Sequence, residues 1–259
     1  METHTKKPLI LISNDDGINS PGLYALASSL KKIGEIIVVA PEYEQSAVGH
    51  SLTMNRPLRV TPFRRNGELF GFAVSGTPAD CVKIALTALL DRTPDIVVSG
   101  INHGQNTAIN VLYSGTVSAS TEGMLFGIKS IAFSICSHSW DIAMDSAAEI
   151  AHDIVKKALE IDFPKNTFLN VNIPAVKKNE IKGTKITKVG NGYWKDFYIK
   201  RQDPFHRDYY WFSGEYFESE YDIENDDIAI KENYVSITPI KYTLTNKEAF
   251  DEFKSLEEN

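Results

Sequence analysis

The chain has 259 residues, of which 42% are hydrophobic and 24% are charged, an ordinary composition for a globular protein with a large core. Its formal net charge of −7 argues against a surface that coats nucleic acid, which needs an excess of lysine and arginine. The two cysteines form no CxxC pair, so no disulfide framework is expected. The N-terminal apolar run is too short for a signal peptide or a membrane span, which predicts a cytoplasmic protein without a membrane partner.

Apolar runs of strand length alternate with helical patterns over the first two-thirds of the chain. The runs are continuous, as is typical of parallel strands buried on both faces, and cover residues 9–12, 36–40, 96–98, 131–135 and 168–173. Helices are expected from Pro21 to Gly34, from Thr77-Pro78 onward, over residues 117–126 and over residues 146–159. This alternation predicts a three-layer α/β sandwich with a mostly parallel sheet.

A predicted β-hairpin interrupts the alternation of strands and helices. Residues 58–62 and 69–74 flank Asn66-Gly67, a strong hairpin turn signal.

The sequence pattern changes from residue 182 onward, where helical periodicity disappears. Aromatic residues crowd between residues 193 and 217, and a strand over 235–240 and a terminal helix over 246–256 follow. We interpret the aromatic segment either as an arm that packs on another surface, such as another subunit, or as a β-rich lid on its own domain. Both interpretations stay open, because aromatic side chains serve cores and interfaces alike.

Polar residues follow the predicted strands at the edge where an open α/β sheet gathers its functional groups. Asn14-Asp15-Asp16-Gly17 follows the first strand, and Gly17 gives the chain the freedom to bend so that both aspartates reach one ion. Hard oxygen ligands select Mg²⁺, Mn²⁺ or Ca²⁺ over zinc. The alternative is that the aspartates only form an Asx-turn at a helix entry.

A second cluster, Tyr113-Ser114-Gly115-Thr116, precedes the helix expected from residue 117. Hydroxyl and glycine residues at a helix N-terminus make a cradle for phosphate, although simple N-capping by Ser114 or Thr116 explains the same pattern. Residues 99–116 are expected to form a long loop rich in glycine and asparagine, and such loops are usually functional. His103 lies in this loop but is not assigned to the site.

These motifs and others resemble, in order along nearly the whole chain, the SurE family of stationary-phase survival proteins. The matching segments are Asn14 to Gly17 with Pro21-Gly22, Ala40-Pro41 with Ser46, Ser51 to Thr53, Gly76 to Val82, Ser99 to Asn102 with Gly104 and Asn106, Tyr113 to Val117, Asn170 to Pro174, and Val235 to Pro239.

The resemblance implies a metal-dependent nucleotidase that hydrolyses nucleoside 5′- and 3′-monophosphates, with exopolyphosphatase activity in some members. It implies one Mg²⁺ or Mn²⁺ per subunit on Asp15, Asp16, Ser46 and Asn102. It further implies a Rossmann-like core and a C-terminal region exchanged between subunits of a homodimer or homotetramer. Residues 1–181 are accordingly expected to form the catalytic core, and residues 182–259 the β-rich oligomerisation region. Residues 196–224 match the family poorly.

Asp15 and Asp16 are the expected catalytic residues, because they hold the ion that activates water for attack on phosphorus. The sequence leaves open whether one of them acts instead as general base or as nucleophile. The phosphate is expected to contact Asn14, Asn106, Ser114, Gly115 and Thr116. Two alternatives remain, a haloacid-dehalogenase-type phosphatase, which prefers Asp-x-Asp, and a nucleotide-binding module without catalysis. A Rossmann dehydrogenase is disfavoured because no GxGxxG follows the first strand.

Overall fold

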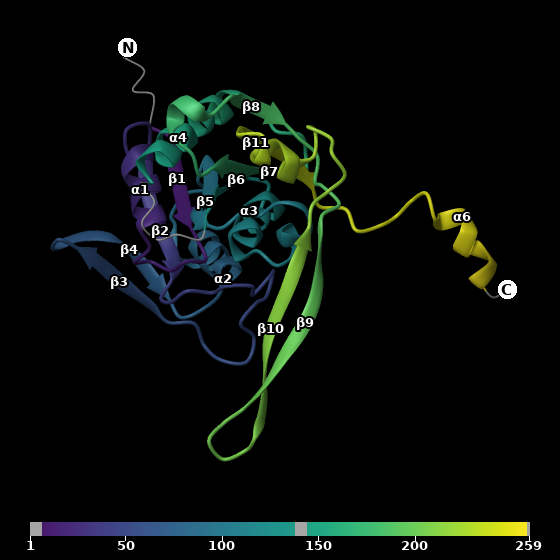
Figure 1. Cartoon of the computed structure of the whole chain (residues 1–259). Helices are drawn as coiled ribbons and strands as arrows, with labels where there is room; N and C mark the ends of the chain where they lie inside the picture. Colours follow the sequence, from purple (N-terminus) through teal and green to yellow (C-terminus); the bar gives the residue numbers. More distant parts are fainter. Residues whose placement is uncertain (1–6, 138–143, 258–259) are drawn as a thin grey trace, which may run out of the picture.

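A nine-stranded mixed sheet forms the centre of the computed structural model, which describes residues 7–137 and 144–257 (Figure 1). The strand order is β3-β4-β2-β1-β5-β6-β7-β11-β8. The strands of this sheet are β1 (Leu9–Ser13), β2 (Glu35–Pro41), β3 (Val60–Arg65), β4 (Glu68–Val74), β5 (Ile96–His103), β6 (Lys129–Cys136), β7 (Thr167–Pro174), β8 (Gly183–Ile186) and β11 (Tyr234–Lys241). The run from β4 to β7 is parallel, whereas β3 and β11 are antiparallel to their neighbours β4 and β7.

Helices cover both faces of the sheet, so the predicted three-layer α/β architecture is confirmed (Figure 1). The helices are α1 (Pro21–Leu30), α2 (Pro78–Ile84), α3 (Gly115–Leu125), α4 (Asp145–Glu160), α5 (Asp226–Lys231) and α6 (Phe250–Phe253). Side chains of β1 alternate between the layers, as a strand buried on both faces requires. Ile10 and Ile12 pack in the cluster that contains α1 and α4, and Leu11 packs in the cluster that contains α2. None of the helices in the described residues has the length and hydrophobicity needed to cross a membrane.

The predicted helix starts are confirmed by their caps. The Ser20 hydroxyl accepts a hydrogen bond from the Leu23 N–H (3.2 Å), and Thr77 forms a capping box with Asp80. The predicted end of the first helix at Gly34 is wrong, since α1 ends at Leu30. The N–H groups of both Ile33 and Gly34 bond the Leu30 carbonyl, which closes the helix with a turn.

The segment expected to be a loop from residue 99 to residue 116 is largely ordered as regular structure. β5 continues through Asn102 to His103 after a shift in its register with β6, and residues Ala108–Leu112 form a 3₁₀ turn. The polar side chains at the end of β5 hid this strand from a hydrophobicity pattern. Their neighbour on β6 is also polar, since Asn102 pairs with Ser134.

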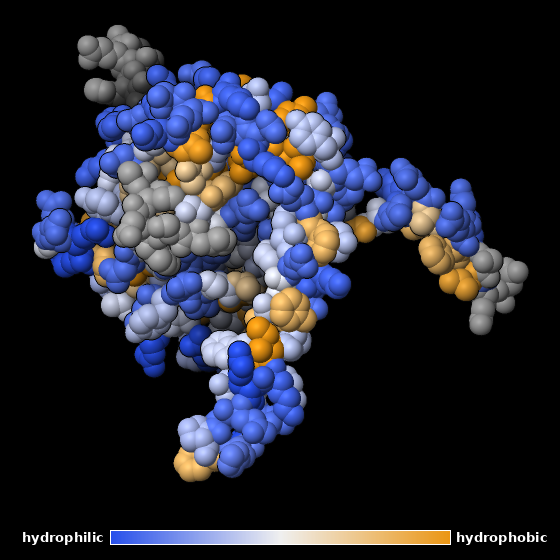
Figure 2. All heavy atoms as spheres, viewed as in Figure 1, coloured by the Kyte–Doolittle hydropathy of each residue, from blue (hydrophilic) through white to orange (hydrophobic). Residues whose placement is uncertain are grey.

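The aromatic segment forms an extended hairpin, which is called the arm below. β9 (Tyr193–Gln202) and β10 (Asp208–Phe217) make a separate antiparallel hairpin that extends from the body (Figure 1), and every residue of β9 is exposed. Hydrophobic side chains gather along this hairpin and on α6 (Figure 2).

The rest of the C-terminal part returns to the main sheet through β8 and β11. The expectation that no helix lies between residue 182 and the terminal helix is wrong, because α5 precedes β11. The terminal helix is shorter than expected and consists of α6 with a 3₁₀ turn at Lys254–Leu256. The functional division at residues 181/182 stays a prediction.

Candidate functional site

The turn that follows β1 carries the two adjacent aspartates. Gly17 has a φ of +90°, a conformation that residues with a side chain rarely adopt, so the chain can reverse towards α1. The Asn14 side-chain amide donates to the Gly17 carbonyl (3.0 Å) and to the Ser20 hydroxyl (2.8 Å). Asn14 is fully buried, and these two bonds make it the brace of the turn.

The carboxylate of Asp15 lies against the N-terminus of α3. It accepts hydrogen bonds from the Thr116 N–H (3.0 Å) and from the Thr116 hydroxyl. A Cβ at Gly115 would lie 2.9 Å from the Asp15 Cβ, so only glycine allows α3 to start this close to the carboxylate. Burial and the neighbouring charge of Asp16 raise the pKa of Asp15 to about 6, although the Thr116 bonds oppose this shift.

Asp16 is held from the end of β5 by His103. Its Oδ2 atom lies 3.3 Å from the donating His103 N–H and 3.4 Å from the His103 Nδ1 atom. Burial raises the pKa of Asp16 to about 6 and lowers the pKa of His103, which favours the neutral ring. His103 was not assigned to the site from the sequence, because a lone histidine in an expected loop carries no pattern; its contact with Asp16 follows from the extension of β5 to His103.

A hollow of about 200 Å³ opens beside Asp15 at the carboxyl edge of the sheet. It is lined by Asp15, Ser46, Ala47, Asn102, His103, Gly104, Gln105, Asn106, Asn110, Tyr113 and Ser114. The structure therefore brings together five predicted site residues from three strand-end loops and the start of α3. Asn14, Asp16, Gly115 and Thr116 are not among the residues that line it, and Thr116 directs both of its donors at Asp15 rather than into the hollow.

The donor set at the hollow fits a hard divalent cation. The Asn102 Nδ2 atom donates to the Gly104 carbonyl (2.8 Å), so the Oδ1 atom is the group left to coordinate. The Ser46 hydroxyl donates to a Glu44 carboxylate oxygen (2.5 Å) and keeps its lone pairs. In the described part of the chain, no lysine or arginine pairs with Asp15 or Asp16. Carboxylate, amide and hydroxyl oxygens, as on Asp15, Asn102 and Ser46, are ligands that suit Mg²⁺ or Mn²⁺.

Ser114 and Asn106 both line the hollow. The Ser114 hydroxyl caps α3 by accepting from the Val117 N–H (3.1 Å), so the N-capping role suggested by the sequence is present. The Asn106 side chain lines the hollow and donates to the Ser134 hydroxyl (2.8 Å) on β6. Both groups have fixed positions before any ligand binds.

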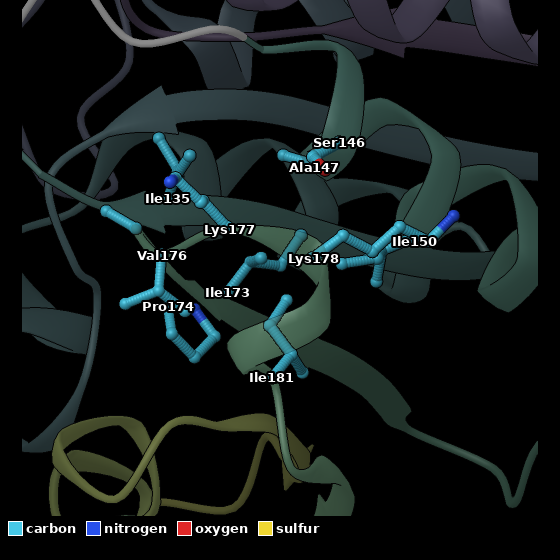
Figure 3. Close-up of a pocket in the computed structure, with 11 residues that line it drawn as sticks. Ile135, Ser146, Ala147, Ile150, Ile173, Pro174, Val176, Lys177, Lys178 and Ile181 are labelled. Atoms are coloured by element: carbon cyan, nitrogen blue, oxygen red, sulfur yellow. The ribbon is translucent and has the colours of Figure 1, made fainter.

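A second cavity, of about 380 Å³, lies at the carboxyl ends of β6 and β7 (Figure 3). Its walls are mostly apolar and include Ile135, Ile150, Ile173 and Ile181. None of the predicted site residues lines it. The polar hollow beside Asp15 is therefore the candidate site.

Comparison with known proteins decides the family. The family model described as Survival protein SurE matches residues 10–196. The chain belongs to the SurE family. The resemblance inferred from the motifs is thus confirmed.

Members of the SurE family that are similar to this chain carry the name 5′-nucleotidase SurE. The protein from Chlorobium chlorochromatii is 46% identical over 239 residues, which cover 92% of this chain and 88% of the relative. The protein from Alkaliphilus metalliredigens is 46% identical over 249 residues, which cover 95% and 98%. The crystal structure of the SurE protein from Aquifex aeolicus matches with a TM-score of 0.84 at 41% identity, covering 97% of this chain and 100% of that chain. The relatives' name agrees with the predicted enzyme class.

Proposed function

We propose that this SurE-family chain is a divalent-metal-dependent nucleotidase that hydrolyses nucleoside monophosphates to nucleoside and phosphate. The observation that carries the proposal is a pair of adjacent aspartates at a polar hollow: Asp15 is buried and lines the hollow, and the side chain of Asp16 is only 7% exposed. Such a pair is electrostatically unfavourable alone and becomes favourable around a cation. The name of the similar relatives, 5′-nucleotidase SurE, supports a 5′-monophosphate as substrate.

The metal ligands in this proposal are Asp15, Asp16, Ser46 and Asn102. When bound, a Mg²⁺ or Mn²⁺ ion supplies a positive charge that polarises phosphoryl oxygens and lowers the pKa of water. Thr116 orients Asp15 through two hydrogen bonds, and His103 orients Asp16 from the end of β5. These contacts fix the carboxylates before the substrate arrives, which is the basis of electrostatic preorganisation.

The phosphate in this proposal meets Asn106 and the start of α3. Ser114 is the N-cap and Gly115 and Thr116 begin the first turn of that helix, whose dipole favours an anion. Thr116 acts there through Asp15, since both of its donors bind that carboxylate. Asn14 contributes by bracing the turn that bears the aspartates. Hydrolysis of 3′-monophosphates and of short polyphosphate belongs to the same proposal, since both present a terminal phosphoryl group.

The arm formed by β9 and β10 supports the further proposal of a homodimer or homotetramer. Its exposed aromatic residues resemble the composition of interface cores. A cytoplasmic location and the assignment of residues 182–259 to assembly belong to this proposal as well.

A phosphate-release panel tests the function. AMP, other purine and pyrimidine 5′- and 3′-monophosphates and tripolyphosphate are each incubated with Mg²⁺, Mn²⁺ or EDTA. We expect release from 5′-monophosphates with a divalent ion and none with EDTA. Release that EDTA leaves unchanged contradicts metal dependence, and tight nucleotide binding without release under every ion favours the non-catalytic binding module.

A further inference from the structure

A row of buried polar side chains crosses the sheet next to the candidate site. Asn102 on β5 pairs with Ser134 on β6, Ser134 pairs with Asn172 on β7, and Asn172 pairs with Ser236 on β11. Asn170 precedes Asn172 by two positions and shares its face of the sheet. Apart from Asn102, these side chains have no exposed area.

Two of these residues bind one residue of the candidate site, Asn106. The Asn106 N–H donates to the Asn172 Oδ1 atom (2.8 Å), and the Asn172 Nδ2 atom donates back to the Asn106 carbonyl (3.2 Å). This is the pair of bonds that a residue in an adjacent strand would provide. The Asn170 Nδ2 atom donates to the same carbonyl (2.7 Å). Asn106 is therefore attached to the sheet by side chains, although it lies beyond the end of β5.

The side chain of Asn106 is fixed from the same direction. Its Nδ2 atom donates to the Ser134 hydroxyl (2.8 Å), which sits beside Asn172 in the register. The residue lines the hollow that contains Asp15. Buried groups of the sheet thus hold both the main chain and the side chain of Asn106. The part of Asn106 that lines the hollow therefore has a single orientation.

The composition of β7 argues that this arrangement is not needed for the sheet itself. Asparagine is depleted in strands, and a buried amide that lacks a partner is unfavourable. The Asn170 Oδ1 atom is buried and has no hydrogen-bond partner in the described residues. Valine at these positions would suit a strand better, so the two amides point to a role at Asn106.

We propose that Asn170 and Asn172 are positioning residues that clamp the main chain of Asn106 and so aim its side chain at the phosphoryl group of the substrate. The inference rests on the proposed function, in which Asn106 meets that group. Neither residue touches the substrate; each acts through Asn106.

Kinetics of Asn172→Ala and Asn170→Ala test the clamp, with Ser236→Ala as the matched control. Ser236 lies in the same row and bonds Thr187 rather than Asn106. At saturating Mn²⁺ and well below the melting temperature, we expect Asn172→Ala to raise both KM for AMP and the inhibition constant of inorganic phosphate by about tenfold, the size of one buried hydrogen bond. Asn170→Ala should give a smaller rise and Ser236→Ala none, and kcat should change less than KM.

A double-mutant cycle with Asn106→Ala separates positioning from general destabilisation. If Asn172 acts through Asn106, its substitution has little further effect on KM once the Asn106 side chain is gone. Additive effects, or variants that melt earlier but keep the KM and phosphate inhibition of the wild type, overturn the inference. Should Asn172→Ala not fold, Asn170→Ala decides by the same criteria.

Binding measurements keep this inference distinct from the proposed function. If the wild type releases no phosphate from any nucleotide, the proposed function fails. Calorimetric binding of inorganic phosphate with Mn²⁺ then tests the clamp, and weaker binding to Asn172→Ala than to Ser236→Ala supports it. A wild type that binds no phosphate overturns both.

Discussion

Thr116 donates its backbone N–H (3.0 Å) and its hydroxyl to the carboxylate of Asp15, a residue 101 positions earlier in the chain. This contact joins the end of β1 to the start of α3. It places the helix dipole behind a carboxylate that is predicted to bind the metal, and thereby favours the charged form.

The Thr116 hydroxyl is expected to set the orientation of Asp15 for metal binding. Thr116→Val keeps the shape and the backbone donor but removes the hydroxyl, so we expect the Mn²⁺ concentration for half-maximal activity to rise about tenfold. Thr116→Ser retains the hydroxyl and should stay near the wild type. A valine variant with an unchanged metal requirement would rule out this role.

Each aspartate of the pair is expected to be essential for turnover. Asp15→Asn and Asp16→Asn keep the size of the side chain but remove a charge that the ion requires. We expect phosphate release to fall at least about a hundredfold, the usual effect of losing a preorganised group in an active site. The fold should remain, as measured by circular dichroism. Asp162→Asn, at an exposed position, is the control, and near-normal turnover of either site variant would contradict the assignment.

Glu122 is expected to make the stability of the protein depend on pH. Its buried carboxylate lies 2.8 Å from His50 Nε2 and 2.9 Å from Lys83 Nζ. Burial works to raise the pKa of Glu122, but the bonds and charges of His50 and Lys83 outweigh it and lower the pKa. Because the pKa of Glu122 is lower in the folded than in the unfolded protein, its ionised carboxylate stabilises the fold at pH values above the unfolded pKa. This stability is lost as the pH falls through the folded pKa.

Urea unfolding of Glu122→Gln against the wild type measures this contribution. We expect the variant to be less stable at pH 7, with the difference shrinking below about pH 4.3, the ordinary pKa of glutamate. Asp162→Asn should show no such trend. A stability difference that is constant from pH 3 to pH 7 would show that the contact is not electrostatic.

The arm is expected to hold subunits together. Tyr198 and Phe212 lie opposite each other on β9 and β10, with ring centroids 5.5 Å apart, and both are exposed in the single chain. We expect the pair Tyr198→Ser and Phe212→Ser to lower the mass in sedimentation or light scattering towards that of a monomer. Lys195→Ser, on the same arm, should leave the mass unchanged. An aromatic-to-serine variant that keeps the wild-type mass would contradict the role of the arm.

Local chemistry made much of the fold and part of the site predictable. Each of these features depends on a few neighbouring residues: the apolar strands, the caps at Ser20 and Thr77, and the Asp15-Asp16-Gly17 turn. Contacts across the chain were not predictable in this way. Nothing near Thr116 marks it as the partner of Asp15. Ser46 and Asn102 follow predicted strands, but only the family resemblance singled them out as ligands.

The end of β5 could not be predicted from the sequence for a different reason. Hydrophobic patterns detect strands whose neighbours are apolar, but Asn102 pairs with Ser134. Its strand is therefore invisible until the adjacent strand is known. His103 was left out of the site for the same reason, because its contact with Asp16 exists only once β5 has been extended.

The polar row also has a consequence for biosynthesis. Its last member, Ser236, lies on β11, which covers the edge of β7 but follows every other strand of the sheet in the sequence. Until β11 emerges from the ribosome, β7 is an open strand edge next to the amides that hold Asn106. A nascent or truncated chain that stops before β11 therefore lacks the cover of that edge.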